Sequence, residues 1–351
     1  MKISLAMIVK NASKYIERSL QSVMHIVDEV VIVDTGSTDN TVDILRKYDN
    51  VNLYQIEWRN DFSYARNFSI EKTSGDYVLV LDADEYLVEG SRNELVSLAE
   101  KGLIGRIQII SNFNKDNQTF ESSEYVSRFF PRAIRFVGII HEQLDSKIKR
   151  EKLTVKVKHD GYYQTNKSKR NIPLLLKSLK ENPDDPYYLF QLGVELRIDK
   201  QYEKSYFFLK KSYVLSNKSN SYFGRLVIEI INCGKELGQD EVLKIIKDNE
   251  EVLKNIADFH FAKGMYYLEY SLKYPNKGEE FISIIERSFL TCLELNSEYL
   301  IGTSSFLPSY NLGILYELTG NKDKAIKYYK HATSYGYSLA KNRLENIVGN
   351  Q

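Results

Sequence analysis

The sequence predicts an α/β domain with a doubly wound, mostly parallel sheet, followed by an all-α domain of helical repeats. In the first half, short apolar segments alternate with helix-like segments, as is typical of parallel sheets with right-handed crossovers. Carboxylates follow the second and fourth apolar segments, and a helix-pair pattern recurs in the second half. The 351 residues are enough for two domains, which we expect at residues 1–165 and 166–351.

Four short apolar runs near the start of the chain are expected to be buried parallel strands. Ser13 is expected to cap the first helix, and Gly75 to end the third. Carboxylates at the strand ends favour the spatial order 3-2-1-4, which puts Asp34 and Asp82 on one edge of the sheet. The expected strands are residues 3–9, 30–33, 51–56 and 77–81, with a later strand at 106–111 and a polar turn at 112–117.

The fourth of these runs ends in three carboxylates within four residues. On extended backbone, Asp82 and Asp84 point to the same side and can reach one hard cation. One of them can instead hold a sugar hydroxyl while the other holds the metal, and the alternative to both is an acidic turn that closes the strand. The chain has no glycine-rich phosphate loop of the two common types, so a bound diphosphate would need a metal or arginines.

Asp34 ends the second expected strand as Asp82 ends the fourth. A carboxylate there can accept hydrogen bonds from the ring N–H groups of a base or from ribose hydroxyls. The alternative is that Asp34 satisfies backbone N–H groups of its own turn.

Four segments follow one another in the first half of the chain: Ile-Val-Lys-Asn, Val-Asp-Thr-Gly-Ser-Thr-Asp-Asn-Thr, Asn-Asp-Phe-Ser-Tyr-Ala-Arg-Asn and Leu-Asp-Ala-Asp-Glu. In this order and spacing they resemble the family 2 glycosyltransferases of GT-A fold. The resemblance covers roughly residues 1–160 and implies a nucleotide-diphosphate sugar, a divalent cation (Mn²⁺ or Mg²⁺) and inversion at the anomeric carbon. It places Asp82 near the ribose and Asp84 on the metal, and Thr35 stands where many members have a second aspartate.

Three arginines are candidates for binding the nucleotide sugar. Arg66, which matches the Ala-Arg-Asn segment, can reach the diphosphate or brace the metal loop; the alternative is an ion pair with Glu71 or Asp61. Arg128 and Arg132 can offset charge on a leaving diphosphate, or can be structural.

The segment 138–143 is the candidate source of the general base. An acceptor must lose its proton as it attacks the anomeric carbon, and a carboxylate or imidazole can take that proton. The resemblance puts the base at Glu142, with His141 orienting the acceptor or Glu142; the alternative for His141 is a core histidine. His159 ends a strand-like run where GT-A enzymes often supply a late histidine to the metal, and imidazole favours Mn²⁺ over Mg²⁺.

The second half carries two copies of a pattern that resembles the tetratricopeptide repeat, at 185–212 and 311–332, with a helical but irregular stretch between them. Such a domain is typically used for self-association, here a homodimer, or for binding an acceptor protein; the alternative is that it buttresses the catalytic domain. The combination narrows the resemblance to peptide S-glycosyltransferases of the sublancin type, although other repeat-bearing members and lipopolysaccharide-core enzymes share the motifs.

The charge, the cysteines and the first residues of the chain bear on its partners and its compartment. A net charge of +1 argues against a nucleic-acid binder driven by bulk electrostatics. The two cysteines lack metal-type spacing, and the first residues do not read as a signal peptide, so we expect a cytoplasmic protein.

These patterns together predict a metal-dependent, inverting, hexosyltransferase-like enzyme that uses a nucleotide-diphosphate sugar, UDP-linked in the simplest interpretation. The acceptor is left open among a glycan, a lipid-linked sugar and a peptide Cys, Ser or Thr. The alternative of another class is a non-catalytic scaffold that only holds a nucleotide.

Overall fold

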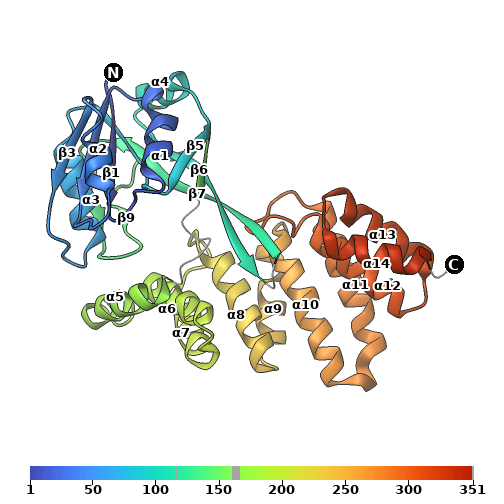
Figure 1. Cartoon of the computed structure of the whole chain (residues 1–351). Helices are drawn as coiled ribbons and strands as arrows, with labels where there is room; N and C mark the ends of the chain where they lie inside the picture. Colours follow the sequence, from blue (N-terminus) through green and yellow to red (C-terminus); the bar gives the residue numbers. More distant parts are fainter. Residues whose placement is uncertain (116–117, 160–166, 350–351) are drawn as a thin grey trace. The chain divides into compact units, whose positions relative to one another are not determined.

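The computed structural model describes residues 1–115, 118–159 and 167–349 (Figure 1). It contains two compact units, Met1–Ser178 and Leu179–Gln351. The predicted domain boundary between residues 165 and 166 lies outside the described residues. The predicted fold class, a mixed α/β domain followed by a helical domain, is confirmed.

The first unit is built on an eight-stranded mixed sheet of order β3-β2-β1-β4-β7-β6-β10-β5. Within it, β1 pairs in parallel with β2 and β4, and β2 pairs in parallel with β3, so the predicted order 3-2-1-4 is confirmed. The carboxyl ends of these four strands therefore share one edge. The four strands are β1 (Ile3–Val9), β2 (Glu29–Asp34), β3 (Val51–Gln55) and β4 (Tyr77–Val80).

The remaining strands extend this sheet and add a small second one. β7 is antiparallel to β4 and β6, while β10 is parallel to β6 and antiparallel to β5. β6 and β7 form a hairpin that extends beyond the other strands (Figure 1), so the expected turn at 112–117 is wrong for residues 112–115, which continue β6. These strands are β5 (Glu85–Glu89), β6 (Ile104–Lys115), β7 (Gln118–Pro131), β8 (Phe136–Val137), β9 (Gln143–Leu144) and β10 (Arg150–His159).

The central strands are buried on both faces, which explains their continuous apolar sequences. Leu5 of β1 belongs to a cluster with Ile16 of α1 on one face, and Ala6 and Val80 belong to a cluster with Ile70 of α3 on the other. The helices of this unit are α1 (Ile16–Val23), η1 (Met24–Ile26), α2 (Thr41–Leu45), α3 (Phe62–Glu71) and α4 (Arg92–Glu100).

Two helix ends differ from the sequence predictions. Ser13 does not cap α1, because the N-cap position is Tyr15 and the Ser13 amide donates instead to Asp39 at 3.1 Å. Gly75 does not end α3, whose C-cap is Lys72. Gly75 is needed where the chain passes β1, since a Cβ there would lie 2.5 Å from the Ser4 Oγ.

The second unit is a succession of packed helices, with α6 against α7, α10 against α11 and α12 against α13. α5 (Ser168–Glu181) carries the chain from the first unit into the second. The other helices are α6 (Pro186–Ile198), α7 (Tyr202–Leu215), α8 (Phe223–Leu237), α9 (Val242–Leu253), α10 (Ala257–Lys273), η2 (Pro275–Lys277), α11 (Gly278–Glu294), α12 (Phe306–Leu318), α13 (Lys322–Ser334) and α14 (Ser338–Gly349).

The recurring glycines of the repeat-like pattern let paired helices approach closely. A Cβ on Gly193 of α6 would lie 2.5 Å from the Leu209 Cγ of α7, and a Cβ on Gly313 of α12 would overlap the Tyr329 ring of α13. The Ser205 hydroxyl, which faces the first of these contacts, donates to the Gly193 carbonyl at 2.7 Å. The small residues at these positions are therefore set by packing.

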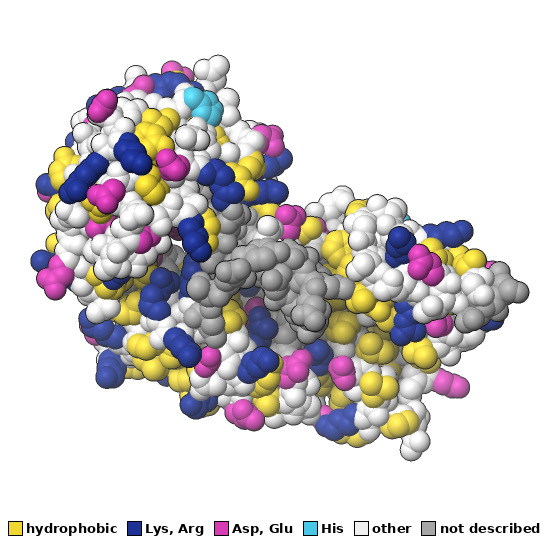
Figure 2. All heavy atoms as spheres, in the orientation of Figure 1, with side chains coloured by type: hydrophobic (Ala, Val, Ile, Leu, Met, Phe, Trp, Pro, Cys, Tyr) yellow, Lys and Arg dark blue, Asp and Glu magenta, His cyan; other side chains and the backbone are white. Residues whose placement is uncertain are grey.

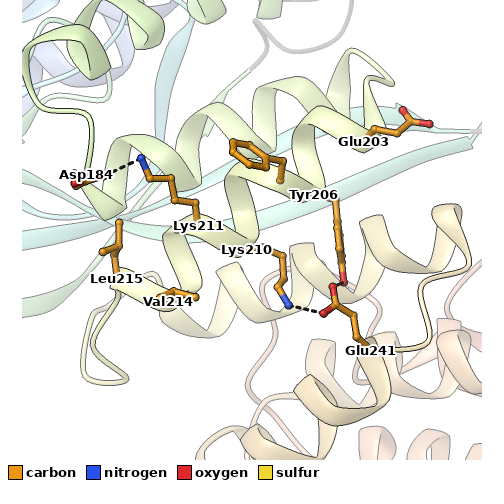
Figure 3. A pocket seen from close by; sticks show the side chains of 9 residues that line it. Asp184, Glu203, Tyr206, Lys210, Lys211, Val214, Leu215 and Glu241 are labelled. Atoms are coloured by element: carbon orange, nitrogen blue, oxygen red, sulfur yellow. Dashed lines mark hydrogen bonds and ion pairs between the residues drawn. The ribbon is translucent and has the colours of Figure 1, made fainter.

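The outer surface of the second unit carries an open groove on α7. Its apolar part includes Phe207, Val214 and Leu215, all exposed. At its borders, Lys210 pairs with Glu241 and Lys211 with Asp184, each at 2.8 Å (Figure 3).

Charge is dispersed over the molecule, and the cysteines are internal. On the face in Figure 2, basic and acidic side chains are interspersed, in line with the net charge of +1. Cys233 and Cys292 are both fully buried and unpaired, and burial raises the pKa of each thiol.

No helix in the described ranges is long and apolar enough to cross a membrane.

Candidate active site

The two aspartates after β4 lie in a turn, not on extended backbone. β4 ends at Val80, the Glu85 amide donates to the Asp82 carbonyl at 3.0 Å, and the Asp82 amide donates to the Glu85 carboxylate at 2.8 Å. The expectation that Asp82 and Asp84 point to the same side of a strand is therefore wrong. The turn instead gives the two carboxylates different partners.

Asp82 is held between two arginines from different elements. Arg66 of α3 donates from Nη2 to one carboxylate oxygen at 2.7 Å, and Arg128 of β7 donates from Nη2 to the other at 2.9 Å. Arg128 also contacts the Glu85 carboxylate at 3.3 Å. Arg66 and Arg128 are only 6% and 9% exposed, so this is a buried network rather than the surface ion pair that was the alternative for Arg66.

The arginines keep Asp82 ionised. Burial alone would raise the pKa of Asp82, but attraction to Arg128 and Arg66 outweighs burial and lowers that pKa well below its ordinary range. Burial likewise opposes the charged form of both arginines, and the neighbouring carboxylates nevertheless raise the pKa of each. For Glu85, burial prevails over the attraction of Arg128 and raises the pKa of its carboxyl.

Glu142 lies in the same network through Arg66. The Arg66 Nε donates to a Glu142 carboxylate oxygen, so one guanidinium contacts both Asp82 and Glu142. Glu142 follows β8 in the segment 138–142, which β8 and β9 close as a hairpin: Phe136 pairs with Leu144. The structure therefore brings the predicted base next to the predicted ribose-binding carboxylate.

The first turns of α3 hold this hairpin. Asn67 forms two hydrogen bonds with the Phe136 backbone, donating to its carbonyl at 2.9 Å and accepting from its amide at 2.8 Å. The Ser63 hydroxyl donates to the Gly138 carbonyl, and the Phe62 amide donates to the Ile139 carbonyl at 2.9 Å. These contacts explain the segment Asn-Asp-Phe-Ser-Tyr-Ala-Arg-Asn, whose Ser63, Arg66 and Asn67 share one helix face.

His141 sits at the tip of the hairpin, beside Glu142. Its φ of 48° lies in the left-handed region, which is uncommon for a residue other than glycine. Such a conformation persists where the surroundings fix it, and it often marks a functional segment.

Asp84 and His159, the two predicted metal ligands, lie in contact. His159 is the last residue of β10, which pairs with β5 so that His159 faces Glu85, and its Nε2 lies 3.1 Å from the Asp84 Oδ2. Burial disfavours the charged imidazole, but Asp84 outweighs it and raises the pKa of His159. Burial opposes the charged form of Asp84, but the hydrogen bond and charge of His159 together with the charge of Lys167 outweigh burial, so the pKa of Asp84 is lowered.

Lys167, which the sequence analysis did not single out, also points to this pair. Its Nζ lies 3.7 Å from the Asp84 Oδ2. No short motif surrounds Lys167, so only the fold reveals its position, which is immediately before α5.

The donor atoms of Asp84 and His159 fit a divalent cation that is completed by substrate. In the described part of the chain, no group of three or more His, Cys, Asp or Glu is arranged to hold a metal by itself. Magnesium typically uses one or two carboxylates together with waters and substrate phosphates, and an imidazole also suits Mn²⁺. One carboxylate and one imidazole match that kind of shared site.

Asp34 is turned toward its own loop. It is 1% exposed, and its carboxylate accepts hydrogen bonds from the Gly36 and Ser37 amides, both at 3.1 Å from Oδ2. This is the turn role that was its alternative, and its contact with a base or ribose stays a prediction.

Arg132 lies outside the cluster. It donates to the Thr73 carbonyl at 3.1 Å, and its amide donates to the Asp76 carbonyl, which precedes the amino end of β4. Arg132 follows the end of β7 and stands four positions after Arg128, a spacing of roughly 13 Å along extended backbone. Its predicted place at the leaving diphosphate is therefore wrong, because the register of β7 against β4 puts it at the opposite end.

Three comparisons bear on this site. Residues 4–157 match the family model described as glycosyl transferase family 2. The SPbeta prophage-derived glycosyltransferase SunS of Bacillus subtilis is 30% identical over 241 residues, covering 64% of this chain and 57% of that protein. A TPR repeat-containing protein of Synechococcus elongatus is 30% identical over 210 residues, covering 55% and 51%. The chain thus spans little more than half the length of these curated relatives.

Among solved structures, S. aureus TarS 1–349 matches 96% of this chain and 92% of its own, with 14% identity and a TM-score of 0.33. The family match begins at the second residue of β1, covers β2, β3, β4 and most of β10, and includes Asp82, Asp84 and Glu142. Residues 4–157 of this chain are thus similar to a glycosyl transferase family 2 domain.

Proposed function

We propose that this protein is a metal-dependent, inverting glycosyltransferase that moves a sugar from a nucleotide-diphosphate donor, UDP-linked, to an acceptor. The observation that carries this proposal is the meeting of three sets of groups at one edge of the sheet. Asp82 with its arginines, Glu142 on the hairpin, and the Asp84–His159 pair all lie at or beside the turn after β4.

In this proposal Glu142 is the general base. The acceptor oxygen or sulfur attacks the anomeric carbon and forms the new bond as its proton passes to a Glu142 carboxylate oxygen. The bond between the anomeric carbon and the phosphate oxygen breaks, and its electron pair leaves with the nucleoside diphosphate. Attack from the face opposite the leaving group inverts the configuration.

The other groups bind and orient the sugar donor. Asp82 remains ionised and can accept from ribose hydroxyls, with Arg66 and Arg128 fixing its orientation. Arg66 Nη1 and Arg128 Nε are buried and have no hydrogen-bond partner among the described residues, which favours an anionic ligand. Asp84 and His159 would hold the divalent cation, with Lys167 adding positive charge beside them. When bound, that cation offsets the charge that develops on the diphosphate.

A hydrolysis assay tests the proposal. Purified protein is incubated with UDP-glucose, UDP-galactose or UDP-N-acetylglucosamine in the presence of Mn²⁺ or Mg²⁺, and UDP release is measured. We expect metal-dependent release from one of these sugars, lost on chelation. UDP binding without release from any of them, even when candidate glycan, lipid-linked and cysteine-containing peptide acceptors are added, would favour the scaffold alternative instead.

The setting of the enzyme is part of the proposal. Both cysteines are unpaired in the fold, which is in keeping with a reducing compartment such as the cytoplasm. The helical unit is the proposed contact for an acceptor or for a second copy of the chain, which size-exclusion chromatography with light scattering would test.

A further inference from the structure

We infer that Arg66 is a positioning residue that sets the Glu142 carboxylate for proton removal and ties it to the sugar-donor side of the site. This inference rests on the proposed function, because it takes Glu142 as the base. It assigns to Arg66 a role on the acceptor side, which is distinct from any contact of that arginine with the diphosphate.

The Arg66 guanidinium contacts two carboxylates at once. Arg66 uses Nη2 for Asp82, at 2.7 Å, and Nε for Glu142. Asp82 belongs to the turn after β4 and Glu142 to the hairpin of β8 and β9, so these segments meet through this side chain. One cationic side chain thus lies between the two carboxylates and contacts both of them.

Hydrogen bonds from α3 fix the hairpin of β8 and β9. The Asn67 side chain holds the first strand of the hairpin by two hydrogen bonds with the Phe136 backbone. The Ser63 hydroxyl holds the beginning of the tip by donating to the Gly138 carbonyl. Arg66 acts further along, on the Glu142 carboxylate itself. Its guanidinium also lies over the Phe136 ring, 5.7 Å from the centroid. The same helix face thus fixes both the backbone of the hairpin and the side chain that the chemistry uses.

Only an arginine can make this pair of contacts. A guanidinium presents several N–H groups in a rigid plane, whereas an ammonium is a single point charge on a flexible stem. Arg66→Lys would therefore keep the positive charge near Asp82 or near Glu142 but would not bridge them. Displacement of a catalytic group by about 1 Å can cost about 10²-fold in rate.

The experiment is a double-mutant cycle on UDP release from the sugar that the wild type hydrolyses fastest. We expect Arg66→Lys to lower turnover about 10²-fold, with a much smaller change in the affinity for UDP and Mn²⁺ measured by calorimetry. In a Glu142→Gln background, Arg66→Lys should lower turnover no further, because the base it positions is already gone. Equal fold losses in the two backgrounds would overturn the inference.

Two controls make the result specific. Arg92→Lys is the same chemical change at a half-buried arginine that pairs with Asp28 at 2.8 Å, outside the network of Asp82 and Glu142, and it should leave turnover near that of the wild type. Asn67→Ala loosens the same hairpin at Phe136 without touching Asp82, and it should also reduce turnover more than UDP affinity. If Arg66→Lys does not fold, Asn67→Ala is used in its place. Unchanged turnover in Asn67→Ala would count against positioning of Glu142 by this helix face.

A second readout does not require activity. Hydrogen exchange of peptides covering residues 136–144 should be faster in Arg66→Lys than in the wild type, while peptides of β1 and β2 keep their protection. Unchanged exchange in 136–144 overturns the positioning role. If the wild type releases no UDP from any sugar while Arg66→Lys still shows faster exchange in 136–144, the proposed function alone is contradicted.

Discussion

The Asp84 carboxylate and the His159 imidazole meet at the end of the sheet, with Oδ2 and Nε2 3.1 Å apart. Asp84 lies in the turn after β4 and directly precedes β5, whose first residue, Glu85, pairs with His159 at the last position of β10. A cation shared with a diphosphate would bind where this pair lies.

Replacing Asp84 tests the metal role. Asp84→Asn keeps the size of the side chain and removes its charge, so we expect metal-dependent UDP release to fall by about 10²-fold or more while the fold survives. The measurement is turnover against Mn²⁺ concentration. Asp43→Asn, at an exposed residue that pairs with Arg46 at 3.6 Å, is the matched control. Near-normal turnover with the usual Mn²⁺ dependence in Asp84→Asn would rule out this ligand.

Replacing Glu142 tests the base. Glu142→Gln should lower turnover by about 10²- to 10⁴-fold and leave UDP affinity nearly intact, because the carboxylate serves the acceptor. A thiol acceptor should lose less than a hydroxyl, since a thiol is already partly ionised near neutral pH. Glu151→Gln, at a surface residue paired with Lys101, serves as control. Weakened UDP binding with unchanged turnover would move the base role to His141.

The close approach of α12 and α13 makes a stability prediction. Gly313→Ala favours the helix intrinsically by about 1 kcal/mol, but the new methyl overlaps the buried Tyr329 ring. We expect the overlap to dominate and the second unit to lose about 1–3 kcal/mol of unfolding free energy. Chemical denaturation followed by circular dichroism measures this. Gly278→Ala, where a Cβ would meet nothing within 4 Å, should be neutral or stabilising, and equal behaviour of the two variants would contradict the packing argument.

His260 makes the stability of the second unit depend on pH. Burial lowers the pKa of His260 despite the hydrogen bond between its Nε2 and the Lys254 carbonyl at 2.8 Å. The folded form therefore binds fewer protons than the unfolded chain below about pH 6.5. The stability associated with neutral His260 is full above that pH and is lost as the pH falls toward the lower folded pKa.

The measurement compares unfolding temperatures at about pH 7.5 and about pH 5.5. His260→Gln should lose less stability over this interval than the wild type, because glutamine has no proton to take up. The exposed His25→Gln should keep the wild-type dependence. An identical pH dependence for wild type and His260→Gln would contradict the prediction.

The sequence was sufficient for the sheet because its central strands are buried on both faces. Burial of β1, β2 and β4 makes each an apolar run, and short alternation with helices leaves few possible topologies, so the order of the first four strands could be predicted. The ends of elements were less predictable. A turn formed by Asp82 and Glu85 replaced the expected extended segment, because side-chain hydrogen bonds compete with the strand pattern there.

The contacts of the site depend on long-range register, which no local pattern encodes. Arg128 and Arg132 fit the sequence prediction equally well, and only the pairing of β7 with β4 decides which one reaches Asp82. The link from Arg66 to Glu142 requires the hairpin of β8 and β9 to dock on α3, and the sequence predicted neither of those two short strands.

The burial of both cysteines affects how the acceptor can be studied. Cys233 and Cys292 are the only thiols of the protein; neither is exposed, and burial raises the pKa of each. The thiolate is the nucleophile that attacks an alkylating reagent, so such reagents should react slowly with the native enzyme. A cysteine on an added peptide would then be the reactive thiol in the mixture, and its protection from maleimide as sugar is transferred would report S-glycosylation with little background from the enzyme.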